Sequence, residues 1–368
     1  GYFVNTTGGV VSVNLPAGTA GDVVAIKDYA NTFDSNAVTL VQNGSDKIGG
    51  SAVNAVLSTE GLAVTLVFVD STQGWLVTDN GTQDTAPTTR FITATGGTIT
   101  CSGNFRIHTF TGPGALCVSC AGNPSGSTTV DYLVVASGGG GGSGLGGGGG
   151  AGGFRTNFPS SCSGIPVSVQ PYPIAVGSGG AAGIPDGGSG TPGNNSTFSS
   201  ITSTAGGGAV ARSSPTPVGP GGSGGGGSGL AAYPGGTGNT PPTSPPQGND
   251  GGDGSSGTKR SGGGGGGAAG DGGDALSATY AVGGVGSSNS ITGSAIFYAG
   301  GGGGNGDPGG PAPSGLGGNG GGGNGGPSTN GTAGAANTGG GGGGGAGSCS
   351  NGAAGGSGIV IIRYKFQN

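Results

Sequence analysis

The chain has 368 residues, of which 103 are glycine and 22 are proline, while only 7% are charged and 5% aromatic. Glycine destabilises helices and brings no side chain to bury, so this composition excludes ordinary helical domains. The formal net charge of −5 comes from few groups and does not favour a disordered chain. No basic stripe suits nucleic acid, and the longest apolar stretch, residues 62–69, is too short to insert in a membrane.

The first third of the chain carries short runs rich in valine. They occur at residues 10–15, 22–26, 37–41, 52–57, 62–69 and 75–77. Turn-forming pairs such as Asn43-Gly44 and Asn80-Gly81 stand between them, which predicts strands joined by tight turns. We therefore expect a β-sandwich or barrel over residues 1–83, and a small β-connector over residues 84–130.

Residues 8–80 resemble small β-modules of tail-fibre and related structural proteins from marine and cyanobacterial phages. The resemblance lies mainly in the stretch from Leu66 to Trp75, which reads LVFVDSTQGW. It implies a strand, a turn and a second strand at this point.

Glycine is concentrated after residue 136: the first 136 residues contain 18 glycines, and residues 137–368 contain 85. Uninterrupted runs lie at 138–142, 146–150, 262–267, 300–304 and 339–345. One such run would be a flexible linker, but the segments between these runs are too short to be domains. The alternative is a set of polyglycine-II helices that lie side by side and hydrogen-bond to each other, because glycine lets backbones approach closely. The irregular period excludes collagen.

Apolar segments frame this region at 131–136 and 359–366, and both are rich in branched side chains. The pattern of an entering strand, many glycine runs and a leaving strand resembles the glycine-rich distal adhesins of T-even-like phage long tail fibres. The resemblance implies a polyglycine-II sandwich over residues 131–368, closed by those two strands. It also implies an extracellular virion protein that contacts other fibre proteins and a host surface receptor, either a glycan or an outer-membrane protein, as a homo-oligomer with a trimer favoured.

Proline-stiffened insertions between the glycine runs carry aromatic and amide side chains that could bind a receptor. They include segments near residues 158, 172, 298 and the stretch 233–250. The candidate receptor-binding residues are Phe158, Tyr172, Tyr233, Asn239, Asn249, Asp250 and Tyr298. A structural role as simple chain reversals is the alternative for any one insertion.

Little in the sequence indicates catalysis. We expect the lone histidine, His108, to lie at the surface or a rim, because no motif marks a nucleophile and a carboxylate beside it. GxGxxG patterns carry no information in so glycine-rich a chain. We therefore expect no enzyme activity and no cofactor.

The five cysteines are odd in number and too few for a disulfide framework. Cys117 and Cys120 have the spacing of a zinc half-site, which Cys101 and His108 could complete, but free thiols or a disulfide are simpler, and we expect no metal. Cys162 and Cys349 could form a disulfide across the glycine-rich region.

One further expectation and two alternative functions remain. Because methionine is absent, we expect the chain to be processed or to be part of a longer protein. A rival function is a self-assembling subunit of a viral or extracellular filament, which would use residues 359–366 or the N-terminal strand to complete a neighbour's sheet. An ice-binding bundle would need a flat, regular face, which the irregular insertions disfavour.

Overall fold

The computed structural model describes residues 1–81, 89–159, 164–185, 188–212, 219–230, 233–256, 260–275, 281–306, 314–347 and 349–368. This described part is all-β and contains no helix. No helix long and apolar enough to cross a membrane occurs in it. The chain forms two compact units, Gly1–Thr89 and Arg90–Asn368.

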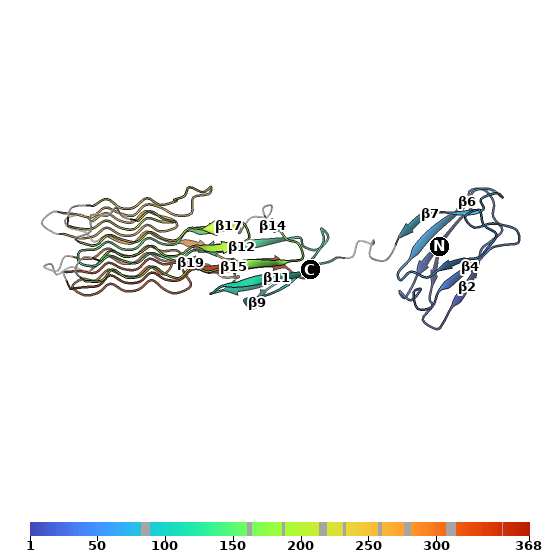
Figure 1. Cartoon of the computed structure of the whole chain (residues 1–368), viewed down its shortest axis with the longest axis horizontal. Helices are drawn as coiled ribbons and strands as arrows, with labels where there is room; N and C mark the ends of the chain where they lie inside the picture. The colour runs from blue at the N-terminus through green and yellow to red at the C-terminus, as the bar shows by residue number, and fades with distance from the viewer. Residues whose placement is uncertain are drawn as a thin grey trace. The chain divides into compact units, whose positions relative to one another are not determined.

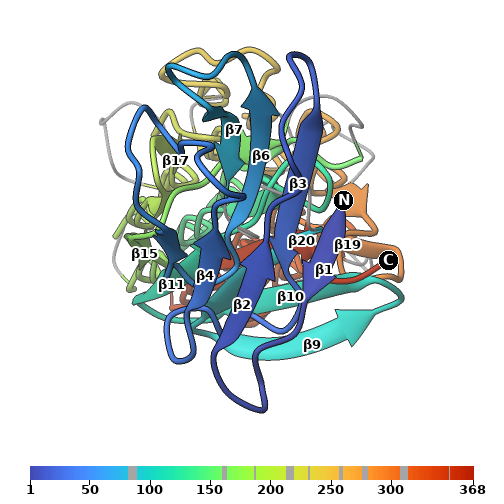
Figure 2. The same ribbon diagram turned by 90° about the vertical axis from the view of Figure 1, so that its right-hand side faces the viewer.

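The first unit is a sandwich of two sheets (Figure 2). One sheet has the order β1-β3-β6-β7, and the other has the order β2-β4-β5. Alternate residues of β3 and β6 are buried, and Trp75 packs edge-on against Phe68 at 5.5 Å in the core. The strands are β1 (Tyr2–Val4), β2 (Val11–Asn14), β3 (Val23–Asp28), β4 (Val38–Val41), β5 (Ala55–Leu57), β6 (Ala63–Phe68) and β7 (Trp75–Gly81).

The second unit begins with a larger sandwich. Its first sheet has the order β13-β12-β20-β10-β9, with β14 paired to β12, and its second has the order β17-β16-β15-β11-β8. The strands of the first sheet are β9 (Thr98–Ser102), β10 (Phe105–Phe110), β12 (Thr129–Val135), β13 (Phe154–Thr156), β14 (Ile165–Pro166) and β20 (Ile359–Lys365). Those of the second are β8 (Ile92–Thr95), β11 (Gly114–Ala121), β15 (Pro171–Ala175), β16 (Ser196–Phe198) and β17 (Ile201–Ser203), and a hairpin adds β18 (Ser287–Asn289) and β19 (Ile296–Tyr298).

The two framing segments of the glycine-rich region pair directly, since β12 runs antiparallel to β20 from Asp131↔Arg363 to Val135↔Ile359. Strand β20 also pairs with β10 on its other side. It is therefore internal to its own sheet and is not available to complete a neighbour's sheet. The segment 84–130, which the sequence suggested as a separate connector, contributes β8 to β11 to these same sheets.

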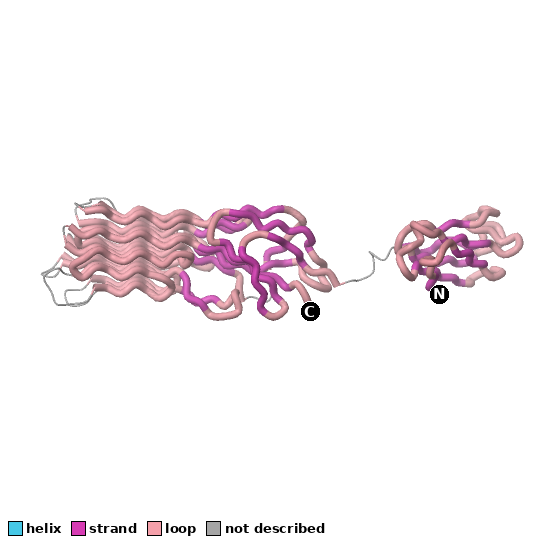
Figure 3. The backbone as a smooth tube through the Cα atoms, turned by 90° about the horizontal axis from the view of Figure 1, so that it is seen from below, coloured by secondary structure: helices cyan, strands magenta, loops and turns pink. Residues whose placement is uncertain are grey.

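The glycine runs form a bundle that extends from the strands of the second unit (Figures 1 and 3). Their backbone hydrogen bonds repeat every three residues. Along the first run, Gly138 and Gly141 donate to the segment at 353–356, Gly139 and Gly142 to the segment at 147–150, and Gly140 and Ser143 to the segment at 188–191. A strand would return to the same neighbour every second residue, whereas a polyproline-II-type helix has about three residues per turn. The pattern is consistent with the predicted polyglycine-II sandwich.

The first run also accepts hydrogen bonds from three further segments. Its carbonyl groups accept from the N–H groups of residues 180 and 183 in one segment, 342 and 345 in a second, and 209 and 212 in a third. The run thus has six hydrogen-bonded neighbours, and residues 132–153 are buried throughout. Most backbone groups of this buried stretch bond to other backbone groups, as burial favours.

Close approach explains the need for glycine in these runs. A Cβ built on Gly149 would lie less than 3.0 Å from the backbone of Gly139, and one on Gly141 would lie equally close to the backbone of Gly343. Real Cβ atoms essentially never come so near, and a backbone neighbour held by its own hydrogen bonds has no room to move. The space that side chains fill in an ordinary core is therefore occupied here by adjacent backbones.

Substitution Gly149→Ala should lower the unfolding free energy of the second unit by about 1–3 kcal/mol or more, because its methyl group would overlap the Gly139 backbone. Gly112→Ala is the matched control, since a Cβ at Gly112 meets nothing within 4 Å. Denaturant unfolding of the two variants measures the difference. Equal stability of both variants would show that the bundle is not close-packed.

Candidate functional site

The bundle has two ends: one joins the strands of the second unit, and the other, which we call the far end, lies opposite them (Figure 1). At the far end, Ser143 accepts from the N–H of Arg212 and donates to the carbonyl of Gly188, each at 3.3 Å. Nearby, Gly229 donates to Leu145 at 3.0 Å. These bonds bring distant parts of the sequence together at one end of a common support.

Tyr233 is the sequence-predicted candidate that lies toward the far end. Its N–H donates to Ser228 at 3.3 Å, and its carbonyl accepts from Gly254 at 3.0 Å. The residue is partly buried. Its backbone thus belongs to the bundle.

Two of the predicted candidates lie in hydrophobic cores. Tyr172 is 8% exposed and packs between the sheets, with its hydroxyl accepting from Ser168 N–H at 2.7 Å. Tyr298 is 4% exposed and packs beneath β12 and β20. Tyr172 occupies a core-facing position of β15, whose residues alternate between exposed and buried, and Tyr298 is the buried last residue of β19. Neither ring is at the surface, where a receptor could contact it.

Asn239 organises a turn at the strand end of the bundle. Its side-chain oxygen accepts from Thr243 and Gln247 N–H groups at 3.0 and 3.2 Å. Gln247 is 1% exposed and anchors this turn, because its side-chain oxygen accepts from Thr204 N–H at 2.9 Å. The segment 233–250 is therefore not one loop: it comprises a bundle run, this turn and the start of another run.

Asn249 and Asp250 satisfy backbone groups of neighbouring runs. Asn249 donates from its side chain to Gly267 O at 2.8 Å. Asp250 accepts from Gly238 N–H at 2.7 Å, and Asp253, three residues later, accepts from Gly235 N–H at 2.8 Å. Asp271 repeats the pattern by accepting from Asp250 N–H at 3.2 Å. These exposed carboxylates accept from backbone N–H groups at an edge of the bundle, and no further run in the described part of the chain pairs with those donors.

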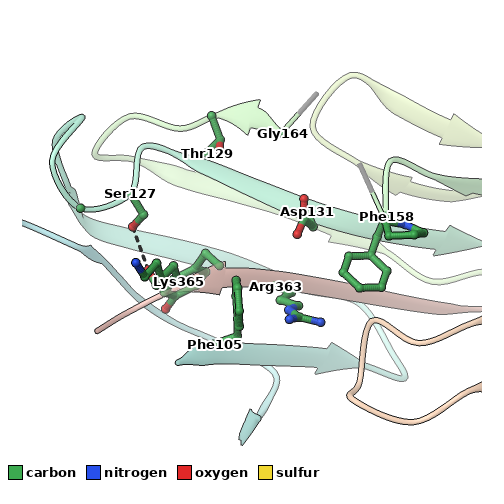
Figure 4. Close-up of a pocket in the computed structure, with 11 residues that line it drawn as sticks. Phe105, Ser127, Thr129, Asp131, Phe158, Gly164, Arg363 and Lys365 are labelled. Carbon is green, nitrogen blue, oxygen red and sulfur yellow. Dashed lines mark hydrogen bonds between the residues drawn. The ribbon is translucent and has the colours of Figure 1, made fainter. Parts of the chain in front are cut away.

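Phe158 lies in a groove of about 600 Å³ on the outer face of β12, β20 and β10 (Figure 4). Phe105, Asp131 and Arg363 rise from the three strands, and Pro159 lies beside Phe158. The other lining residues are Gly126, Ser127, Thr129, Gly164, Tyr364 and Lys365.

The charged groups of this groove face each other in register but do not form an ion pair within 4.0 Å. Asp131 and Arg363 are direct cross-strand partners. The guanidinium of Arg363 instead lies 3.9 Å from the Phe105 ring centroid and 4.8 Å from that of Phe158. Its Nη1 donates to Ile291 O at 3.4 Å. Burial raises the pKa of Asp131, which the charge of Arg363 partly opposes.

Sequence reasoning found Phe158 but missed Phe105, Asp131 and Arg363. A signal was present, since Asp131 and Arg363 each place one charge in an apolar segment, and those segments were expected to pair. The sequence did not reveal that both charges share a register position. It also did not show that Phe105 comes from a strand on the other side of β20.

His108 is 0% exposed, contrary to the surface or rim position expected from its strand. The reason is that β10 is covered on both faces. Nδ1 donates to Gly96 O at 2.7 Å, and Nε2 accepts from the Tyr364 hydroxyl at 3.0 Å, which defines the neutral tautomer. That hydroxyl in turn accepts from Ala94 N–H at 3.1 Å and so joins the two sheets. With both nitrogens engaged, His108 is not available as a zinc ligand.

The cysteines that could have joined His108 lie at or near the surface, whereas its ring is buried. Cys101 and Cys117 are exposed, and Cys120 is partly exposed. Within the described ranges, no group of three or more His, Cys, Asp or Glu side chains could hold a metal ion. Cys349 is exposed, and Cys162 lies outside the described residues, so their pairing stays a prediction.

A family model described as a glycine-rich domain matches residues 118–365, which include most of the sandwich and the bundle. In addition, 70 residues are 39% identical to the baseplate wedge protein gp10 of Enterobacteria phage T4. This stretch is 18% of the chain, and it spans only 12% of the length of that protein.

His108 should make the stability of the second unit depend on pH. Burial lowers its pKa below 6.5, so the unfolded chain binds a proton at a pH where the folded chain does not. Stability is then greatest above pH 6.5 and decreases as the pH falls below it. Thermal unfolding between about pH 5 and 8 measures this slope.

His108→Gln is the variant that tests the assignment, because His108 is the only histidine of the chain. It should lower stability by about 1–3 kcal/mol through loss of a buried hydrogen-bonded network, and it should remove most of the slope. An unchanged slope would assign the pH dependence to other groups.

Proposed function

The chain belongs to the glycine-rich domain family, and we propose that it is a non-enzymatic structural protein of a phage virion. In this proposal it is the distal adhesin of a tail fibre, and the far end of its bundle contacts a receptor on the host cell. The likeness to a T4 baseplate protein supports the virion setting and association with other virion proteins. The resemblance to long-tail-fibre adhesins supports the finer role.

The observation that carries the proposal is the hydrogen-bonded bundle. Its first run has six neighbours, and its amide and carbonyl groups bond to backbones from segments as distant as 209 and 353. A lattice of this kind resists bending because moving one run breaks bonds to several others. Such a support can hold short surface segments in fixed positions, which lowers the entropy lost when they bind.

The far end also offers apolar contact surface. Ile184 is 68% exposed at the end of the run that donates from Gly183 to Gly141. Tyr233 lies partly exposed on another run. A branched aliphatic residue and an aromatic one on a rigid support are suited to a receptor contact, since interface energy concentrates in a few well-held side chains.

The test is adsorption of the virus that carries this chain to the cells it infects. Particles with Ile184→Ala and Tyr233→Ala together should adsorb about tenfold or more slowly, because the variant loses two contact side chains. Val169→Ala is the matched control, as Val169 is 65% exposed but lies between β14 and β15, away from the far end. Normal adsorption of the double variant, with the fold intact by thermal unfolding, would contradict a far-end receptor site.

A further inference from the structure

The groove around Asp131 and Arg363 has the features of a ligand site separate from the far end (Figure 4). Its volume of about 600 Å³ is large enough for a small ligand. Phe158 and Pro159 supply an apolar wall, and the carboxylate and guanidinium lie on neighbouring strands at its floor. Few polar groups set among apolar walls are typical of ligand pockets.

The carboxylate of Asp131 is half-buried and has no hydrogen-bond partner among the described residues. Partial burial makes this charge less favourable than it is in water, although its oxygens still contact solvent. The charge of its cross-strand partner Arg363 offsets this cost only in part, and the two groups form no ion pair, since that guanidinium is turned toward two aromatic rings. The site would gain stability from a ligand that donates hydrogen bonds to Asp131.

The guanidinium of Arg363 also retains bonding capacity. It has five N–H donors, and in the described part of the chain it makes one hydrogen bond, from Nη1 to Ile291 O. Its Nε is buried without a partner, so the donors left for a ligand are those of the two Nη atoms. The rings of Phe105 and Phe158 lie over the guanidinium and hold it in place. A fixed guanidinium suits recognition of a carboxylate on a ligand.

The charge of the groove favours an acidic ligand. Arg363 and Lys365 line it together with Asp131, so its charged lining residues sum to a positive charge, although the chain carries a net charge of −5. A positive groove in a negative protein attracts anions selectively. The hydroxyl of Thr129 and that of Ser127, which donates to Lys365 O at 2.8 Å, add polar atoms along one side.

We propose that this groove binds an acidic saccharide unit of the uronic-acid class. Its carboxylate would pair with Arg363, its ring hydroxyls would donate to Asp131, and its C–H face would lie against Phe158. The site does not depend on the proposed role in adsorption, because it lies on the sheet of the second unit rather than at the far end. A zwitterionic amino acid is the competing ligand chemistry, since an ammonium group could also pair with Asp131.

The test is calorimetric titration of the whole chain with D-glucuronic acid, D-glucose and L-alanine. Glucuronic acid should bind at least about tenfold more tightly than glucose or alanine. Failure of glucuronic acid to bind at about 10 mM, or equal or tighter binding of either competitor, would overturn the proposal.

Two variants identify the groove as the site. Arg363→Gln should weaken glucuronic acid binding by about tenfold or more, whereas Arg106→Gln should leave it unchanged. Arg106 is a matched control because it also lies over an aromatic ring, that of Phe366 at 4.8 Å, but does not line the groove. Equal affinities of these two variants would overturn the assignment.

Asp131→Asn separates binding from folding, and it remains informative if Arg363→Gln folds poorly. It removes a half-buried charge without a hydrogen-bond partner, so the melting temperature should rise while glucuronic acid binding weakens. A purely structural Asp131 would give no such opposite changes. A lower melting temperature or unchanged binding would contradict its role.

Discussion

The second unit depends on hydrogen bonding between backbones that carry no side chains. Because glycine lacks a Cβ, neighbouring runs approach until amide and carbonyl groups bond directly, in a pattern that repeats every three residues. Ordinary cores are stabilised by burying apolar side chains. Here the buried side chains of the bundle are mostly alanine methyl groups, with Leu145 and Val210 among the few larger ones, so the first run is held mainly by its six hydrogen-bonded neighbours.

The sandwich of the second unit is stabilised by buried side chains, whereas the bundle is stabilised by backbone hydrogen bonds. Strands β12 and β20 bury branched side chains on both faces, which gives the second unit hydrophobic cores that the glycine runs lack. The same strands lead directly into the first run and out of the last. At the lateral edge of the bundle, exposed side chains such as Asp250 and Asp253 accept hydrogen bonds from backbone N–H groups that an adjacent run would otherwise pair with. This arrangement limits growth of the bundle in the way that charged edge strands limit sheets.

The sequence predicted the fold class because the fold class is reflected in the amino-acid composition and in the spacing of the valine-rich and glycine runs. Valine-rich runs and turn pairs indicated the first sandwich, and the glycine runs could not all be linkers. The sequence did not predict the burial of His108, because that burial depends on sheets formed by residues far away in the chain. It also placed Tyr172 and Tyr298 among surface candidates, because aromatic residues beside proline or in a short insertion look exposed until their strand pairing is known. Register, which decides that Asp131 meets Arg363, is not encoded in any local motif.

The periodicity of the bundle limits how such a chain can change length. Adding or deleting one residue within the first run would turn each later N–H by a third of a turn, away from its partner and toward another neighbour. A change of three residues restores the direction of every donor, but shifts the run along its axis by one turn. Insertions of arbitrary length are compatible only with the reversals between runs. The reversals at the ends of the bundle can therefore change length in evolution, while the runs inside it must keep their three-residue repeat.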